Sequence, residues 1–447
     1  MNHERAKHLI IGMGPSGLSV GHVLSDLGFN YDFIEKGLHY GVSLDDKTQK
    51  KLFEEQIGGI GGYSRLWGAQ NAFPDEYVID KFLNKFSVSS SLKSNLLKEL
   101  DNLAKVFQIS LDTSNLYENL FKQEISKKYQ IKTVHSIYLK SKILIDYFTV
   151  DVSAKHSNQV EKLNFLDGFV SEIIFTSGES ISINKEQNIY LCAGAFETTR
   201  IYLNSIKKSN QRSKIKDHPS GYILSFQGKN IKGIYKGAEK FIKGTKYKRK
   251  FLIEDQVNGR AGIVEFHYDY LGKLVLPPLE SQNFYQKIQN YINVITIKLF
   301  KKHLFSPRRT HVWIQINQKF DNKNYFEFID GKFNWNWGLL KDDLNFIDYV
   351  KERMSKFLEE NGQKIIWQVE DPTKEFCDAY HPSGSLYYQV GTEVPSVDIF
   401  GRTLSAKNLY ICSTATWPTA SWFNPTFFLM AHSAFIARNS VKMMNSI

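Results

Sequence analysis

The first part of the chain alternates apolar runs with a glycine-rich turn. Residues 8–11 form a short apolar run that predicts a strand, and residues 18–28 carry apolar side chains at helical spacing. A second apolar run at Tyr31–Ile34 predicts another strand, and Gly12-Met-Gly14-Pro-Ser-Gly17 separates the first strand from the helix. The order strand, turn, helix, strand is that of a βαβ unit.

This turn has the glycine spacing of a dinucleotide-binding site. The glycines allow a tight turn and a close approach of a pyrophosphate, whose charge the following helix N-terminus stabilises. Glu35 follows Gly17 by 18 residues, about where the ribose-binding acid of a Rossmann unit lies. The sequence therefore predicts dinucleotide binding, with contacts from Gly12, Gly14, Pro15, Ser16, Gly17, Glu35 and Lys36.

Two further turns of small residues predict a close approach of backbone to ligand. Gly58-Gly-Ile-Gly61-Gly62 has four glycines in five positions. A flexible linker would also be glycine-rich, but Leu66 and Trp67 follow at once and favour a packed loop. Residues 188–203 predict a buried strand, an Ala193-Gly194 turn and a helix.

Near the C-terminus, two polar side chains lie in positions suited to chemistry. His381 is in the loop His381-Pro-Ser-Gly384, and Asn424 precedes Pro425-Thr426, where a helix is predicted to start. A helix N-terminus favours a group that becomes anionic, and a histidine base beside it suits flavin-dependent oxidation of an alcohol. Taken singly, a core histidine and an ordinary asparagine cap are the favoured explanations. We interpret His218, which precedes a proline in a boundary loop, as structural.

The middle of the chain predicts a second domain. Residues 80–107 have helical spacing, and a period-two pattern after residue 143 includes a hairpin near residues 176–179. Residues 223–375 alternate aromatic and polar positions and include a helix at 341–361. The fold class is therefore α/β, with a discontinuous Rossmann-type domain and a second α+β domain built on an antiparallel sheet that forms one wall of a pocket.

Composition limits the class of protein. A chain of 447 residues exceeds what one core usually fills, and 42% hydrophobic and 14% aromatic residues argue against disorder. Cys192, Cys377 and Cys412 are scattered, which indicates a reducing compartment and predicts no metal site. Residues 1–8 are polar, and no apolar run approaches the ~20 residues needed to span a bilayer. We therefore expect a soluble cytoplasmic protein without a cleavable signal peptide.

The net charge of +11 is spread over the chain, with clusters at 207–216, 240–250 and 301–309. A lysine-rich solvated surface is the favoured explanation, and attraction of phosphate-bearing substrates or of an anionic membrane is the alternative. Residues 291–309 join an apolar face to a basic end, as a helix lying on a membrane or packed on its own domain would. No motif for nucleic acid binding is present.

Taken together, these segments resemble the glucose–methanol–choline family of FAD-dependent oxidoreductases. The matching pieces, in the family's order, are HLIIGMGPSGLSVG…FIEKG, GGIGGYSRLWG, YLCAGAFETTRIYLNS, KDHPS, AYHPSGS and NLYICSTATWPTASWFNPTFFLMA. They extend from residue 8 to residue 438, whereas residues 85–140 and 223–375 resemble the family only in the general pattern of polar and apolar positions. The C-terminal end resembles the pyranose-oxidase and bacterial sugar or alcohol dehydrogenase branches most.

The resemblance implies roles for individual residues and a division of the chain. His381 would be the base near the flavin, and Asn424 its partner that orients the substrate hydroxyl. The FAD-binding domain would comprise residues 1–82, 141–222 and 376–447, with 83–140 as a helical insertion or lid and 223–375 as the substrate domain. Beyond the residues of the first glycine turn, the implied FAD contacts are Gly62, Ser64, Trp67, Gly68, Ala193, Gly194, Ser413, Thr414, Pro425 and Thr426.

Three departures from the family pattern change what the resemblance implies. Leu66 stands where some relatives have a histidine bonded to FAD, so we expect non-covalent FAD. Cys412-Ser413-Thr414 replaces an aspartate that touches the ribityl chain in many relatives, which leaves a weaker hydroxyl contact. The chain is also shorter than most of the family, which implies a trimmed and more open substrate domain.

The implied activity is oxidation of a CH–OH group of a sugar, a sugar derivative or another alcohol by hydride transfer to flavin N5. The partners would be this small molecule and an electron acceptor that the sequence does not identify. The basic surface would suit a substrate linked to a nucleotide or a lipid. Three alternatives stay open. They are an FAD-dependent redox-neutral isomerase, mutase or reductase, an NAD-dependent dehydrogenase, and a non-catalytic flavoprotein subunit.

Overall fold

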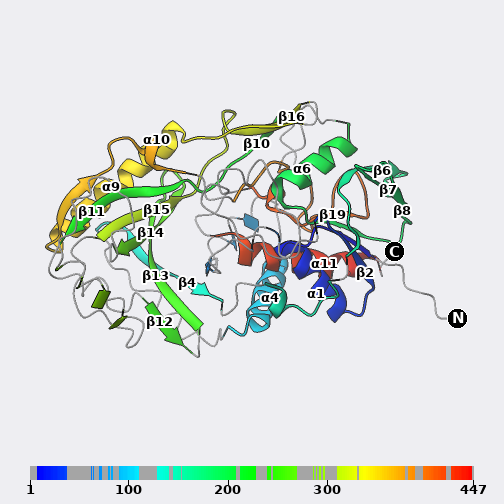
Figure 1. Ribbon diagram of the computed structural model, residues 1–447, viewed down its shortest axis with the longest axis horizontal. Coiled ribbons are helices and arrows are strands. Elements are labelled where there is room, and N and C mark those ends of the chain that lie inside the picture. The colour runs from blue at the N-terminus through cyan, green and yellow to red at the C-terminus, as the bar shows by residue number, and fades with distance from the viewer. Residues whose placement is uncertain are drawn as a thin grey trace.

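The computed structural model describes most of the chain in segments (Figure 1). These are residues 8–37, 62, 64, 70–72, 79–80, 82–83, 90–109, 128–139, 144–152, 154–207, 212–227, 239–242, 245–268, 285, 288, 291–292, 295–296, 310–329, 332–377, 381–387, 396–418 and 424–444. Within them, no helix combines the length and the apolar character that crossing a bilayer requires. Most of the glycine loop (58–61, 63 and 65–69) and residues 297–309 lie outside the described part.

A five-stranded parallel sheet gathers strands from distant parts of the chain. Its order is β19-β9-β1-β2-β5, and every neighbouring pair is parallel. The strands are β1 (His8–Ile11), β2 (Tyr31–Ile34), β5 (Ala154–His156), β9 (Ile189–Leu191) and β19 (Leu409–Ile411). The sequence pattern had predicted β1, β2 and β9, and these predictions are confirmed.

Both faces of the parallel sheet are buried, which explains why its strands are apolar throughout. One face packs on α1 (Pro15–Asp26), α4 (Ser90–Val106) and α11 (Thr426–Met444) through residues such as Ile10 and Tyr190. The other face packs on α6 (Gly194–Ser205) and on a small sheet through Ile11 and Leu191. The small sheet comprises β6 (Val160–Leu166), β7 (Phe169–Phe175) and β8 (Ser180–Ser182), and its β7–β8 turn is the predicted hairpin.

The larger sheet is antiparallel and lies on the other side of the molecule (Figure 1). Its order is β18-β11-β15-β14-β13-β4-β3, with β12 also paired to β13. The strands are β3 (Gln70–Ala72), β4 (Ile131–Tyr138), β11 (Ser220–Gln227), β12 (Glu239–Ile242), β13 (Thr245–Asp255), β14 (Arg260–Tyr268), β15 (Thr310–Ile316) and β18 (Lys364–Gln368). One face packs on α9 (Lys341–Glu360), so the predicted antiparallel sheet and its helix are both confirmed.

The remaining elements are short. A three-stranded sheet contains β10 (Ser213–Lys214), β16 (Tyr325–Ile329) and β17 (Lys332–Asn336). Single turns of helix are found at α10 (Pro372–Glu375), η2 (Leu144–Tyr147) and η3 (Thr414–Thr416).

Part of the predicted helical insertion is wrong. Residues 83–140 contain α4, but they also contain β4, which pairs along its whole length with β13 of the antiparallel sheet. The partner strand follows more than 100 residues later, and no local pattern specifies such a pairing. The domain boundaries themselves stay a prediction.

A buried ion pair fixes α9 to the antiparallel sheet. Arg260 Nη2 donates to Asp343 Oδ1 at 2.7 Å, and the two side chains are 1% and 0% exposed. Asp343 Oδ2 also accepts from the Leu340 amide at 2.9 Å and from Gln318 Nε2 at 2.9 Å. One carboxylate therefore caps the helix and neutralises the guanidinium beneath it.

Replacing Asp343 should therefore destabilise the protein strongly. Asp343→Ala leaves the buried Arg260 guanidinium with only the part-exposed Asp342 as a carboxylate partner among the described residues. It also removes the acceptor of the Leu340 and Gln318 hydrogen bonds, so the cost should approach that of breaking a buried pair, about 3–5 kcal/mol. The measurement is chemical denaturation followed by circular dichroism. Glu352→Ala is the control, because Glu352 forms an exposed pair with Lys356 on the same helix and should change stability by about 0.5 kcal/mol or less. Equal effects of the two variants would contradict this account.

Candidate functional site

The glycine turn after β1 lies against the end of β9. Gly12 has φ +101°, and a Cβ there would lie 2.7 Å from the Cys192 carbonyl oxygen and 3.0 Å from Ala193 Cα. A Cβ at Gly17 would lie 2.0 Å from the Gly12 carbonyl oxygen, so the first turn of α1 packs directly on the turn. The first and third predicted small-residue turns thus meet at the carboxyl edge of the parallel sheet.

The second glycine loop reaches the same place. Gly62 has φ +50°, and a Cβ there would lie 3.3 Å from Gly14 Cα. At Gly14, by contrast, a Cβ would meet no atom of the described part within 4 Å, so the backbone at the start of α1 is open. Ser64 is buried close by in sequence, whereas Trp67 and Gly68 lie outside the described residues.

Glu35 turns back onto this region from the end of β2. Its Oε2 accepts from the Met13 amide at 2.8 Å, and its Oε1 accepts from the Gly37 amide at 3.3 Å. Ser16 is buried, and Pro15 is the first residue of α1. Burial lowers the pKa of the neighbouring Lys36. An open glycine backbone beside a helix N-terminus and an acid fits the nucleotide half of a dinucleotide.

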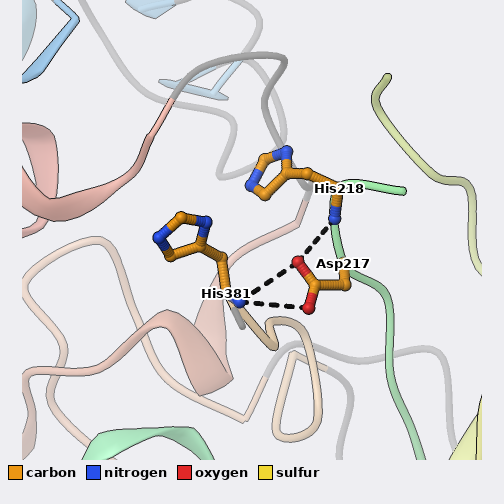
Figure 2. A group of neighbouring side chains, drawn as sticks. All are labelled: Asp217, His218 and His381. Atoms are coloured by element: carbon orange, nitrogen blue, oxygen red, sulfur yellow. Dashed lines mark hydrogen bonds between the residues drawn. The ribbon is translucent and has the colours of Figure 1, made fainter. Parts of the chain in front are cut away.

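His381 is held by a carboxylate from another part of the chain (Figure 2). The His381 amide donates to both oxygens of Asp217, at 3.1 and 3.0 Å, and the His218 amide donates to Oδ1 at 2.5 Å. Lys216 and Ser383 exchange backbone hydrogen bonds beside this contact. The entry to β11 and the His381 loop therefore form one short pairing that the carboxylate completes.

The same loop is joined to the parallel sheet. Thr414 Oγ1 donates to the Pro382 carbonyl at 2.8 Å, and the Gly384 amide donates to the Thr414 carbonyl at 2.9 Å. Ser413 Oγ accepts from the Ala415 amide at 3.2 Å. The hydroxyl-bearing turn after β19, predicted as a cofactor contact, thus links the edge of the glycine turns to His381.

The imidazole of His381 is neutral at physiological pH. Burial lowers its pKa to about 4, and its Nδ1 is buried without a hydrogen bond to any described residue. Its ring contacts that of His218, with centroids 5.5 Å apart and planes at 77° (Figure 2). A neutral imidazole can accept a proton, as a general base must.

Asp217, His218 and His381 also have the composition of a metal site. Their possible ligand atoms lie within 4.8 Å of one another. The Asp217 oxygens, however, already accept from two backbone amides, which supports a tether rather than a metal ligand. The expected absence of a metal stays a prediction.

Asn424 contacts the antiparallel sheet near the start of β11. Its Oδ1 accepts from Gln315 Nε2 at 3.5 Å, and Gln315 lies opposite Ser220, two residues after His218. Helix α11 begins at Thr426, one residue after the predicted start at Pro425. The Pro425 carbonyl already accepts a helical hydrogen bond from the Leu429 amide at 2.7 Å. Whether His381 and Asn424 act together on one substrate stays a prediction.

No protein-family model matches the chain, and no curated protein matches its sequence. Among solved structures, pyridoxine 4-oxidase from Mesorbium loti superimposes with a TM-score of 0.57. The two proteins share a fold. The match covers 97% of this chain and 99% of the oxidase at 12% sequence identity, so the likeness concerns the fold alone.

Sequence reasoning missed the tether and the support of Asn424. Asp217 was visible as part of an Asp-His-Pro motif, but nothing in the motif indicated that its carboxylate would hold the His381 amide. Gln315 lies within an aromatic-polar strand, where its polar position was read as part of a pocket wall. His218, interpreted as structural, proves to contact the His381 ring.

Two glycine variants should separate cofactor binding from folding. Gly14→Ala places a methyl group where no described atom lies within 4 Å, so the apoprotein should keep its melting temperature while FAD affinity falls at least tenfold. Gly17→Ala drives a methyl group into the Gly12 carbonyl and should lower the melting temperature itself. Calorimetry and FAD titration measure both effects. Unchanged FAD binding by Gly14→Ala would remove this turn from the site.

Proposed function

We propose that the protein is an FAD-dependent oxidoreductase of the glucose–methanol–choline type that oxidises a CH–OH group. The observation that carries the proposal is the hydrogen bond from Thr414 Oγ1 to the Pro382 carbonyl. It joins the edge of the parallel sheet where the glycine turns meet to the loop of His381, whose imidazole is neutral. The fold shared over the full chain with an oxidase supports the same class of chemistry.

The chain offers a consistent set of groups for the cofactor. Gly12, Gly14 and Gly17 would lie along the pyrophosphate, Glu35 would face the ribose, and the Ala193-Gly194 turn would lie near the adenosine. Bound FAD would supply the two-electron acceptor for the substrate hydride. We propose non-covalent binding because Leu66 replaces a linking histidine.

The protein's own groups would then handle the proton. His381, neutral above its lowered pKa, accepts the hydroxyl proton of the substrate. Asn424 orients that hydroxyl, and the N-terminus of α11 stabilises negative charge that develops beside it. Asp217 fixes the backbone of His381 through hydrogen bonds to both of its oxygens.

The substrate is proposed as a sugar, a sugar derivative or another alcohol. The solved oxidase with the same fold is named for pyridoxine, so pyridoxine belongs in the substrate panel beside sugars and sugar nucleotides. The favoured branch is that of pyranose oxidases and bacterial dehydrogenases, and the proposed location is the cytoplasm. A redox-neutral isomerase and a non-catalytic flavoprotein are distinguished from this proposal by the anaerobic bleaching of FAD by an alcohol.

His381→Ala tests the proposed base. The variant should retain FAD, because the tether uses only the backbone of residue 381, yet flavin reduction by substrate should fall about 100- to 10,000-fold. Stopped-flow absorbance under anaerobic conditions measures the rate. His156→Ala, on the edge strand β5, is the control and should reduce FAD at the native rate. A native rate in His381→Ala would disprove the assignment.

The pH dependence of reduction tests the environment of His381. Burial disfavours the charged imidazolium, which lowers the pKa from 6.5 to about 4, so the base stays neutral and competent as the pH falls through 6.5. The second-order rate constant for flavin reduction, which reports on the free enzyme, should stay level down to about pH 5 and decline near pH 4. An inflection at about 6.5 would show that the imidazole is solvated in the working enzyme.

A further inference from the structure

The face of the antiparallel sheet opposite α9 carries a row of polar side chains. Directly paired residues place Glu265 and Tyr222 on either side of Trp313, and place Ile263 and Ser220 on either side of Gln315. Side chains of paired residues point to the same face, which we call the polar face. It comprises Lys248, Lys250, Glu265, His267, His311, Trp313, Gln315, Ser220, Tyr222 and Ser225.

The fold does not require charges on this face. Leu252 and Ile263 occupy the same face and pack into the apolar core shared with α1, α4 and α11. Two residues further along the same strands, Lys250 and Glu265 are buried at 3% and 5% exposure. Burying an ion pair commonly gains no more stability than burying apolar side chains of similar size. The replacement of apolar by charged side chains along these strands is therefore not explained by stability.

Two lysines share one carboxylate in this cluster. Lys248 Nζ lies 2.5 Å from Glu265 Oε2, Lys250 Nζ contacts Oε1, and His267 Nε2 lies 3.5 Å from Oε2. Among the described residues, no other carboxylate pairs with either lysine. Burial lowers the pKa of Lys250. Burial also raises the pKa of Glu265, but Lys250 and its neighbours outweigh this and leave that pKa well below its usual range. Within the described part of the chain, two lysine side chains therefore share a single carboxylate.

The cluster lies within reach of the candidate active site. Gln315, which donates to Asn424, is two residues from Trp313 on β15, and Glu265 is directly across from Trp313. From strand geometry, Glu265 is ~9 Å from Gln315 along the polar face. The His267 ring stacks on that of Trp313, with centroids 5.8 Å apart. His267 Nδ1 and Tyr222 Oη share a hydrogen bond of 2.9 Å. An aromatic surface thus lies between Asn424 and the charges.

We propose that Lys248, Lys250 and Glu265 form a subsite for a small oxyanion, so that the substrate is an alcohol carrying a phosphate or carboxylate group. The hydroxyl lies at His381 and Asn424, the body of the substrate lies on Trp313, and the oxyanion balances the second ammonium. Lys248 is the accessible member, since its side chain is 20% exposed whereas that of Lys250 is 4% exposed. This inference extends the proposed function and rests on it for the identity of the reacting hydroxyl.

Anion binding can be measured without turnover. Inorganic phosphate and acetate are titrated by calorimetry into the FAD-loaded protein, with chloride keeping the ionic strength constant. We expect saturable binding of at least one anion and about tenfold weaker binding by Lys248→Gln, which removes one charge contact. Glu265→Gln should bind the anion more tightly, because it removes the competing carboxylate. A purely structural ion cluster would not give this opposite pair of effects.

Lys356→Gln is the matched control. Lys356 also pairs with a glutamate, Glu352, but it lies on α9, against the other face of the sheet. The Lys356→Gln variant should bind the anion with the affinity of the native protein. FAD content and melting temperature verify that each variant is folded. If neither anion binds the native protein, or if Lys248→Gln binds as tightly, the subsite is wrong.

Alcohols in matched pairs connect the subsite to turnover. Glucose is compared with glucose 6-phosphate and glucuronate, and pyridoxine with its 5′-phosphate, by anaerobic flavin reduction. The anionic member should have a KM at least tenfold lower, and Lys248→Gln should remove most of this difference between the anionic and the neutral alcohol. Anion binding with the expected variant pattern but no bleaching by any alcohol would overturn the proposed oxidation alone. Bleaching by neutral alcohols without any anion binding would overturn the subsite alone.

Discussion

The contact between the Asp217 carboxylate and the His381 amide determines the relative position of the two halves of the candidate site. Asp217 precedes β11, which leads into the antiparallel sheet, while His381 lies in a loop bonded to the turn after β19 of the parallel sheet. Hydrogen bonds to a charged acceptor contribute about 1.5–3 kcal/mol, roughly twice a neutral pair. Backbone amides have little freedom to move, so the carboxylate fixes where the imidazole begins.

The tether matters because the two sheets contribute different things. The parallel sheet provides the glycine edge, where Gly12, Gly62 and Ala193 approach closely enough to leave little space for side chains. The antiparallel sheet provides the polar face and, through Gln315, the support of Asn424. A base that must serve a substrate lying between them has to be positioned relative to both, and His381 is bonded to both.

The parts of the fold that the sequence predicted are those set by local rules. The turn at Gly12–Gly17, the hairpin before β8 and helix α9 each follow from residues within a short window, because backbone conformation and amphipathic spacing are local properties. The pairing of β4 with β13 could not be predicted, because it joins segments over 100 residues apart and β4 has no distinctive signal. The Asp217 tether is hidden for the same reason, since its partner lies 164 residues away and contributes only a backbone amide, which every residue but proline has.

Burial has opposite consequences at the two ends of the proposed substrate position. The Asp217 carboxylate near His381 is engaged by backbone amides, and burial lowers the pKa of the imidazole, so His381 loses its charge and can act as a base. In the Lys248–Lys250–Glu265 cluster the lysines hold the pKa of the Glu265 carboxyl well below its usual range despite its burial. The proposed site therefore has a proton-accepting imidazole at one end and two lysines paired with one carboxylate at the other. A molecule with an acidic group at one end and a hydroxyl at the other would be held in one orientation, with the hydroxyl at the base.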